Sequence, residues 1–573
     1  MRRFYVFVSL IALLLCCFCK KAENRDKLPT GNTKYGCVPP TTDSKWFESD
    51  NVAPFFKGTA VLNYPITTSS QKAQQYFNQG LALAYGFNHA EAARSFYYAT
   101  KLDPKCAMAF WGYAYVLGPN YNAGMDPDNY LRAYKAIRQA VKLSDEAPDK
   151  EKDLISALAK RYTAKAVDDR KPYDIAYSKA MKTVKDKYPN DLDIATLYVE
   201  SVMDLHPWDL YDKEGIPKEW TTPIETELQK ILKVNPRHIG ANHFYIHAVE
   251  SSNTPERGNA AAQLFDDGLF AASGHLVHMP SHIYIRTGEY HKGTLANINA
   301  VKKDSIYVTV CHAQGAYPLA YYPHNYHFLA ATATLEGNYK WAKIGAEKTA
   351  ALVHPENMIE PGWGTLQHYY VIPYFVAVKF GKWDAIQKMQ LVSDTLTYPS
   401  AIAHYAKGMA FLGKKNMAEA KRELLRLEEK AQNASMKTMT IWEINTMSDI
   451  LHIATAVLKG EILASEKKYA ESIKVLKQGV AMEDKLNYNE PPDWFFSVRH
   501  YLGAVQIEAG KYNDAIATYE QDLKRLRNNG WAQHGLKLAY QKLNDARKVK
   551  ETEMLLAKSW ATADVDITTS RIK

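Results

Sequence analysis

The sequence predicts an all-α solenoid, a superhelix of antiparallel helical hairpins, behind an N-terminal signal peptide. Three observations lead to this prediction. A helical motif that combines small and large residues recurs along most of the 573-residue chain. Turns of the form Gly-x-aromatic separate successive helices in its centre, and a short apolar segment follows a basic start. Hairpin repeats bury a continuous core only by stacking on one another, so the recurring motif implies an elongated array.

The first segment, residues 1–19, has the pattern of an export signal. Arg2 and Arg3 precede an apolar run over residues 4–19. Such a run is shorter than a membrane-spanning helix and typical of a signal-peptide core. Cysteines at its end resemble the acceptor of a bacterial lipoprotein signal: Cys16, Cys17 and Cys19. We therefore expect an exported protein in the periplasm or cell envelope, with a lipid anchor to a membrane as the alternative to a free mature chain.

Composition is that of an ordinary globular protein and argues against some partners. The chain is 46% hydrophobic and 23% charged, with a net charge of +9. Charges of both signs are mixed along the helices, and neither a basic stripe nor a glycine-rich phosphate loop occurs, so we expect no nucleic-acid partner. Beyond the signal only Cys37, Cys106 and Cys311 remain, which do not make a disulfide framework. The 38 tyrosines suit either a ligand groove or the seams between helices.

The remaining chain divides into four segments. Residues 20–65 lack helical periodicity and are expected to form an extended tether. Residues 66–215 are expected to be N-terminal repeats, and residues 216–395 degenerate central repeats rich in histidine. C-terminal repeats are expected over residues 396–573.

The repeat motif places a glycine in the first helix of a hairpin and alanines with an aromatic residue in the second. In the first copy Gly80 is followed by Ala92, Phe96 and Ala99. Small residues let the two helices approach closely, while large residues fill the seam between hairpins. Further copies centre on Gly112, Gly408, Gly503 and Gly535.

Central repeats are marked instead by their turns. These are Gly288-Glu289-Tyr290, Gly337-Asn338-Tyr339 and Gly381-Lys382-Trp383. Their intervals exceed the roughly 34 residues of a standard hairpin repeat, so extra loops must lie between the helices. Long loops of repeat arrays gather on one face and often carry function.

With these motifs the chain resembles the tetratricopeptide repeat (TPR) family from about residue 70 to residue 558. Several phrases are similar to an exported bacterial TPR subfamily, namely residues 102–112, 242–250, 275–282 and 490–494. The resemblance implies a TPR-like fold. It also implies a concave groove, lined by the first helix of each hairpin, that holds a peptide, a protein or a small molecule. It supplies no substrate.

Histidines of the central repeats are the main candidates for functional residues. His243 and His247 are spaced i, i+4, as are His278 and His282, and such spacings put side chains on one face of a helix. Alignment of the repeats at their turns gives three columns on the first helices: His275 with His324 and His368; His278 with His243 and His327; and His282 with His247. By the resemblance, these columns face the groove.

Neutral imidazole is the commonest metal ligand, and an i, i+4 pair can chelate one ion. We predict metal ligands among His243, His247, His278, His282, His324 and His327, holding either one ion with an open position or two ions. Glu250, His275 and His368 are predicted to line the ligand groove. Glu250 would either complete the site or fix a histidine tautomer. Zinc, copper and iron all suit imidazole ligands, and the sequence does not separate them.

Three hypotheses of function follow. The first is an exported TPR protein whose concave groove binds a ligand through a metal ion. The second is a metalloenzyme that uses the same histidines, and the third is a metal-free scaffold for a protein or peptide. The chain contains no His-Glu-x-x-His, nucleophile elbow or Walker motif, so catalytic residues are unknown. Packing is the alternative role for any single helical histidine, and the fold alone does not decide.

Overall fold

The structure is a computed structural model that describes residues 44–48, 51–56, 62–311, 313, 317–360, 362–390, 395–494 and 496–573. The predicted signal peptide and much of the predicted tether lie outside the described residues. None of the helices in the described ranges is both long and apolar enough to cross a membrane.

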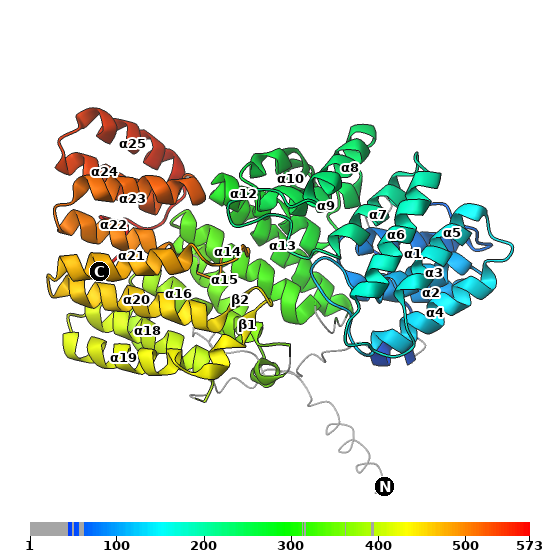
Figure 1. Ribbon diagram of the computed structural model, residues 1–573, viewed down its shortest axis with the longest axis horizontal. Helices are drawn as coiled ribbons and strands as arrows, with labels where there is room; N and C mark the ends of the chain where they lie inside the picture. The colour runs from blue at the N-terminus through cyan, green and yellow to red at the C-terminus, as the bar shows by residue number, and fades with distance from the viewer. Residues whose placement is uncertain are drawn as a thin grey trace, which may run out of the picture.

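Consecutive helices pair as antiparallel hairpins along the chain (Figure 1). The N-terminal helices are α1 Gln71–Ala84, α2 His89–Leu102, α3 Ala107–Val116, α4 Asn129–Leu143, α5 Asp149–Leu158, α6 Lys171–Lys187, α7 Leu192–Met203 and α8 Thr221–Val234. The central helices are α9 Ile239–Glu250, α10 Asn259–Asp266, α11 Gly274–His278, α12 Pro280–Thr287, α13 Tyr290–Cys311, α14 Tyr322–Leu335, α15 Tyr339–Ala351, α16 Thr365–Lys379 and α17 Trp383–Lys388.

The C-terminal helices are α18 Thr397–Gly413, α19 Met417–Ala431, α20 Met447–Ser465, α21 Tyr469–Glu483, α22 Val498–Glu508, α23 Tyr512–Arg525, α24 Gly530–Lys542 and α25 Ala546–Ser559. Between α19 and α20, two short strands pair antiparallel: β1 Thr440–Ile441 and β2 Asn445–Thr446. A π-helical turn over Tyr317–Tyr321 precedes α14.

This architecture confirms the predicted all-α, TPR-like solenoid, and the small-to-large pairing explains its hairpins. Phe96 of α2 lies against Gly80 of α1 and Gly112 of α3, where an added Cβ would come within 2.8 and 2.3 Å of its ring. Tyr519 of α23 takes the same position against Gly503, at 2.4 Å. A side chain larger than hydrogen at these glycines would push the helices apart.

The three predicted Gly-x-aromatic turns are helix boundaries. Gly288 follows α12, Gly337 follows α14 and Gly381 follows α16, with φ of 80°, 78° and 61°. Glycine adopts this left-handed backbone conformation without steric cost, which is why it ends so many helices. In each case the aromatic residue two positions later begins the next helix.

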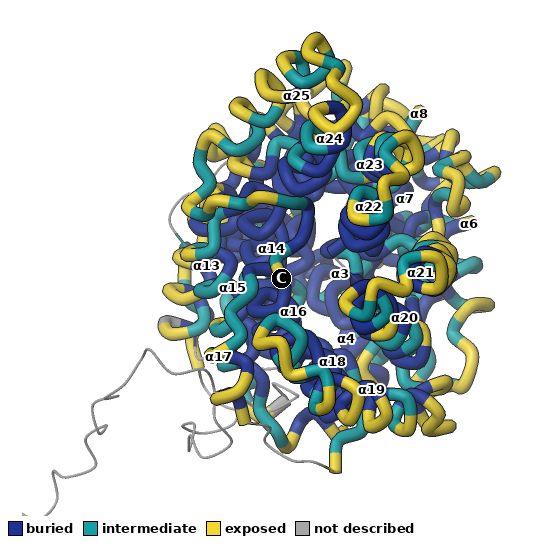
Figure 2. Tube along the Cα trace, turned by 90° about the vertical axis from the view of Figure 1, so that its left-hand side faces the viewer, coloured by how far each residue is buried: buried dark blue, intermediate teal, exposed yellow. Residues whose placement is uncertain are grey.

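Apolar side chains gather in two large clusters that meet within α12. The first extends from Phe47 to Tyr284 and the second from Ile285 to Trp531. Seen along the long axis, the buried residues face inward from the surrounding helices, and the C-terminus lies near the centre of this view (Figure 2). The histidine-bearing helices α9, α11 and α12 stand next to the boundary between the two clusters.

The segment after α25 runs back along the preceding repeats and becomes buried at Ser570 and Arg571. Asp564 accepts a hydrogen bond of 2.6 Å from the backbone N–H of Tyr339 at the start of α15. Arg571 is buried and forms ion pairs with Glu461 of α20 and Glu508 of α22, the latter at 2.8 Å. The chain's own segment therefore occupies the inner face of these C-terminal repeats, where the sequence predicts a ligand groove.

Candidate metal centre

Three stretches of helix bring the central histidines together. Helix α9 carries an i, i+4 pair, the α11–α12 stretch carries three histidines, and α14 supplies one from its first turn. Helix α12 packs against α9, and α11 packs against α14. The residues so gathered are His243, His247, His275, His278, His282 and His324.

Proline at position 280 divides the second His-x-x-x-His pair between two helices. Helix α11 ends at His278 and α12 begins at Pro280. Proline fits the first turn of a helix, where its missing N–H leaves no bond unmade. The pair nevertheless keeps its geometry, because the Nε2 atoms of His278 and His282 are 2.9 Å apart.

The six histidines form two groups of three, which we call triad 1 (His243, His247, His275) and triad 2 (His278, His282, His324). Within each triad, one ring nitrogen from every member lies within 4.8 Å of the other two. In triad 1, Nε2 of His243 is 3.1 Å from Nε2 of His275. All six side chains are buried except that of His324, which is half-buried.

One carboxylate connects the two triads. Glu250 ends α9 and is 1% exposed. Its Oε1 accepts a hydrogen bond from Nδ1 of His247, and its Oε2 accepts one from Nδ1 of His282, both at 2.6 Å. The hydroxyl of Tyr488 also donates to Oε2, at 3.1 Å. Glu250 therefore fixes one tautomer in each triad, which is the second of the two roles that the sequence left open for it.

Two further imidazoles are held in the same way. Nδ1 of His243 is 2.6 Å from the carbonyl oxygen of Tyr85, to which it donates. Nδ1 of His278 is 2.7 Å from Oδ1 of Asn297, whose Nδ2 donates to the carbonyl of Gly293 at 2.7 Å. Because that second bond fixes the orientation of the amide, Oδ1 must be the acceptor facing His278. Four of the six histidines thus use Nδ1 for a hydrogen bond and leave Nε2 without a proton.

This arrangement makes the contact inside triad 2 unfavourable for two neutral imidazoles. Both His278 and His282 donate through Nδ1, so the two Nε2 atoms that face each other at 2.9 Å carry lone pairs. Nε2 of His247 in triad 1 has no hydrogen-bond partner among the described residues. A cation between the nitrogens of each triad would satisfy these atoms, and unpaired buried polar atoms are otherwise costly.

The surroundings favour neutral imidazoles and an ionised Glu250. Burial is the main cause that lowers the pKa of His247. Burial and the neighbouring imidazoles together hold the pKa well below its ordinary value in His243, His275, His278 and His324. Burial alone would raise the pKa of Glu250, but His282 and His247 hold that pKa below its ordinary value. Neutral histidine is the form that binds metal.

Aromatic side chains cover the triads. Phe87 lies 4.5 Å from the ring of His243, and Trp208 lies 5.7 Å from that of His247. Both have left-handed backbone conformations, with φ of 52° for Phe87 and 55° for Trp208. This conformation is rare and costly for bulky residues and is typical of functional sites. Phe328 closes triad 2 from α14, 4.7 Å from the ring of His278. The triads are therefore enclosed, where the sequence predicted an open groove wall.

Two of the predicted residues lie apart from the triads. The ring of His327 is 5.6 Å from that of His368, whose Nδ1 is 2.8 Å from the hydroxyl of Tyr398. One turn of α14 separates His324, which faces α11 and α12, from His327, which faces α16. His327, predicted as a metal ligand, therefore lies outside both triads, and His275, predicted for the groove, is the third member of triad 1.

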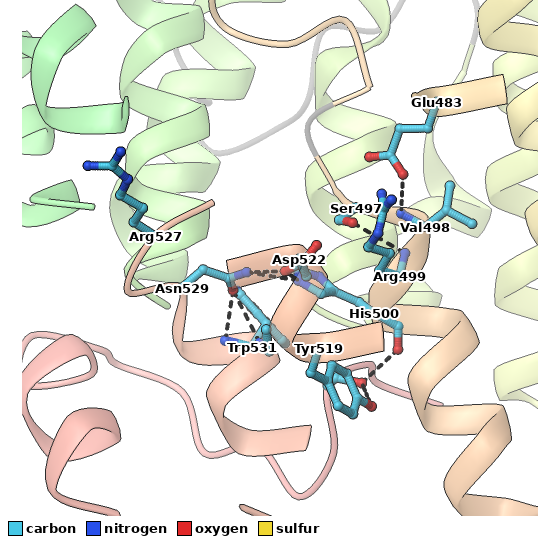
Figure 3. Close-up of polar contacts among 12 residues, drawn as sticks. Glu483, Ser497, Val498, Arg499, His500, Tyr519, Asp522, Arg527, Asn529 and Trp531 are labelled. Atoms are coloured by element: carbon cyan, nitrogen blue, oxygen red, sulfur yellow. Dashed lines mark hydrogen bonds and ion pairs between the residues drawn. The ribbon is translucent and has the colours of Figure 1, made fainter. Parts of the chain in front are cut away.

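Sequence reasoning missed another buried histidine, His500 of α22. Figure 3 shows it beside Asp522 of α23 and Asn529 at the start of α24, and its Nε2 is 3.0 Å from Oδ2 of Asp522. The ammonium of Lys379 is 2.9 Å from Nδ1. Both ring nitrogens have protein partners, so this network connects neighbouring repeats and leaves no nitrogen for a metal ion. The only signal in the sequence was its position beside Arg499 in a repeat motif.

The fold and the site together define a TPR-like α-solenoid with two buried, linked histidine triads. No known protein family and no curated protein matches the chain. Human IFIT1 with m7Gppp-AAAA is similar over 87% of this chain and 92% of its own, with 12% identity and a TM-score of 0.32. Yeast Tom70 is similar over 86% and 93%, with 12% identity and a TM-score of 0.33. The Cut9–Hcn1 complex of the APC/C matches over 87% and 79%, with 11% identity and a TM-score of 0.29. These likenesses are too distant to transfer a ligand or partner.

Proposed function

We propose that the protein binds metal ions through its two histidine triads, with three imidazole ligands for each ion. The main support is the contact in triad 2, where Nε2 of His278 and Nε2 of His282, each with a lone pair, face each other at 2.9 Å. Nitrogens bound to one ion at ~2.0 Å lie roughly 3.3 Å apart. The separations of 2.9 and 3.1 Å are close to that value, and the third ring of each triad has only to close inward.

Hydrogen bonds around the ligands support the same proposal. Metal-binding histidines typically donate their other ring N–H to a carboxylate or a carbonyl, which orients the ring and raises its basicity. Glu250, Tyr85 and Asn297 supply such acceptors to four of the six rings. A histidine that only packs between helices needs no such arrangement, because one hydrogen-bond partner at each ring nitrogen satisfies it.

Three protein ligands leave a coordination position free for a small molecule or for water. Since His324 is half-buried, triad 2 is the side from which such a ligand would enter. This favours a ligand-binding role through the metal and keeps a metalloenzyme as the second candidate function. We also propose that the protein is exported to the periplasm or cell envelope, on the basis of residues 1–19. Fractionation of cells with an antibody against the chain would test that location.

Metal content tests the central proposal. Protein purified without chelators and reloaded with Zn(II) or copper should retain transition metal after exhaustive dialysis, as measured by elemental analysis. The double variant His247→Ala/His282→Ala, which damages both triads, should lose the metal, while His368→Ala, a change outside both triads, should keep the full content. Less than about a tenth of an equivalent in the wild-type protein would refute the proposal and favour the metal-free scaffold.

A further inference from the structure

We infer that the two triads together form a copper(I) site that takes two monovalent ions, whereas a divalent ion fills only one triad. This inference rests on the proposed function and adds the number of ions, their charge and their chemical class. It is drawn from the spacing of the triads, their ligand type and the charges around them.

The triads are close enough for two bound ions to interact. Rings of different triads approach as closely as rings of the same triad: His247 lies 5.5 Å from His282, and His275 lies 5.9 Å from His278. Within triad 1, the ring centroids are 4.9 to 6.3 Å apart. The six imidazoles therefore form one continuous assembly, with an ion position at each end.

Negative charge is scarce in this assembly. Both triads consist of imidazoles, which bind metal in their neutral form, and no described carboxylate belongs to either. Glu250 is the carboxylate in contact with them, and its two oxygens accept from Nδ1 of His247 and His282, so it lies outside the ring of ligands. Arg286 stacks on Tyr488 at 5.3 Å. Burial raises the pKa of the nearby Glu490 to about 8, so this carboxyl group is protonated at neutral pH and adds no negative charge. One carboxylate is left to balance whatever charge enters.

Charge then selects the ion. The repulsion between two divalent ions is about four times that between two monovalent ions at the same distance, because it scales with the product of the charges. In a buried site, little water is present to screen it. Two divalent ions would leave three uncompensated positive charges after Glu250 is counted, whereas two monovalent ions would leave one. Copper(I) is a monovalent transition ion that imidazole binds, and three nitrogen donors can hold it while one position stays open for a further ligand.

Competition titrations of the full chain test the inference. Metal-free protein is titrated with Cu(I) under anaerobic conditions and, separately, with Zn(II), each against a chromophoric chelator. We expect two Cu(I) ions per chain with dissociation constants within about tenfold of each other. We expect one tight Zn(II) ion, with the second bound at least ~100-fold more weakly. His275→Ala disables triad 1 and His324→Ala disables triad 2, so each variant should bind one Cu(I) and one Zn(II).

The titrations distinguish failure of the copper(I) inference from failure of the proposed metal binding. Two Zn(II) ions of similar affinity, or a single Cu(I) ion, in the wild-type chain would overturn the copper(I) pair and leave metal binding intact. Failure to bind either ion would overturn both. The wild-type titrations decide between these results even if a variant does not fold, and far-UV circular dichroism identifies such a variant. His368→Ala is the matched control and should titrate like the wild type.

Discussion

Substitution of Glu250 by glutamine should damage the two triads unequally. The carboxylate accepts from Nδ1 of His247 and of His282 at 2.6 Å each, and it is buried with them. Glutamine keeps one acceptor oxygen and replaces the other with an NH₂ group, which can only donate. The histidine that faces this group must move its proton from Nδ1 to Nε2, the atom that the metal needs.

The size of the effect follows from that geometry. Loss of the hydrogen-bond acceptor behind a metal-binding histidine typically weakens metal affinity about 10–100-fold, which corresponds to about 1.4–2.7 kcal/mol. We expect this loss at the triad that faces the NH₂ group of Glu250→Gln. The other triad keeps its acceptor and loses only the attraction of the negative charge, for which we expect less than about tenfold. Glu250→Ala removes both acceptors and should weaken both triads by the larger factor.

Isothermal titration with Cu(I) under anaerobic conditions, with a competing chelator, resolves the two binding steps. Asn297→Leu is the matched control, because Asn297 accepts from His278 alone and its loss should weaken only triad 2. Tyr488→Phe removes the third hydrogen bond of Glu250 and should leave both steps within about threefold of the wild type. Wild-type affinities at both triads in Glu250→Gln would show that the carboxylate does not set the tautomers.

Three predictions concern stability. Burial raises the pKa of Asp304 to about 7, so the native state keeps a proton that the unfolded chain releases above pH ~4. The free energy of unfolding should therefore fall as the pH rises from 4 to 7, by at most about 1.4 kcal/mol per pH unit. Asp304→Asn should flatten that part of the pH profile. Gly112→Ala should destabilise by about 1–3 kcal/mol in urea unfolding, since its Cβ would lie 2.3 Å from an aromatic ring, while Gly124→Ala, with open space around it, should have little effect. Arg571→Ala leaves the buried Glu461 without its partner and should lower the free energy of unfolding by about 3–5 kcal/mol. Replacement of both residues by Met should restore most of that stability. Equal losses of stability in the single and double variants would contradict this account.

Local rules explain why so much of the fold could be predicted from the sequence. A glycine that faces an aromatic ring, as Gly112 faces Phe96, depends only on residues within one hairpin and its neighbour. The turns at Gly288, Gly337 and Gly381 have a left-handed backbone, and glycine adopts this conformation without steric cost, so its position in the sequence predicts the turn. Repeat proteins depend on contacts between neighbouring units, so such signals add up along the chain.

The composition of each triad required the three-dimensional structure. Helical spacing correctly placed His243 beside His247, and His278 beside His282, on shared faces. It could not show that His275 turns back toward α9, because α11 is only one turn long and follows a loop. Repeat alignment treated His327 as equivalent to His278, but it is His324 whose ring contacts that of His278, at 4.9 Å, while His327 contacts His368.

Burial of the triads also depends on residues distant in the chain. Phe87 comes from the turn after α1 and Trp208 from the loop after α7, and both close over α9 with left-handed backbones. Neither bears a motif that marks it as part of a site. Their strain must be offset by the packing that they complete, so the same aromatic residues would lose their support if the histidine helices moved.

The position of the triads between two apolar clusters gives metal binding a structural consequence. Triad 1 draws on α9 and α11, within the first cluster, while triad 2 adds α14 from the second. Glu250 bonds to both triads, and Tyr488, from the loop before α22, reaches it from the C-terminal repeats. If the proposed ions bind there, they would stabilise the native chain in proportion to their binding free energy, because the unfolded chain holds no such site. Since the proposed ligands come from both sides of the boundary, that stabilisation would act on the contact between the two halves of the solenoid.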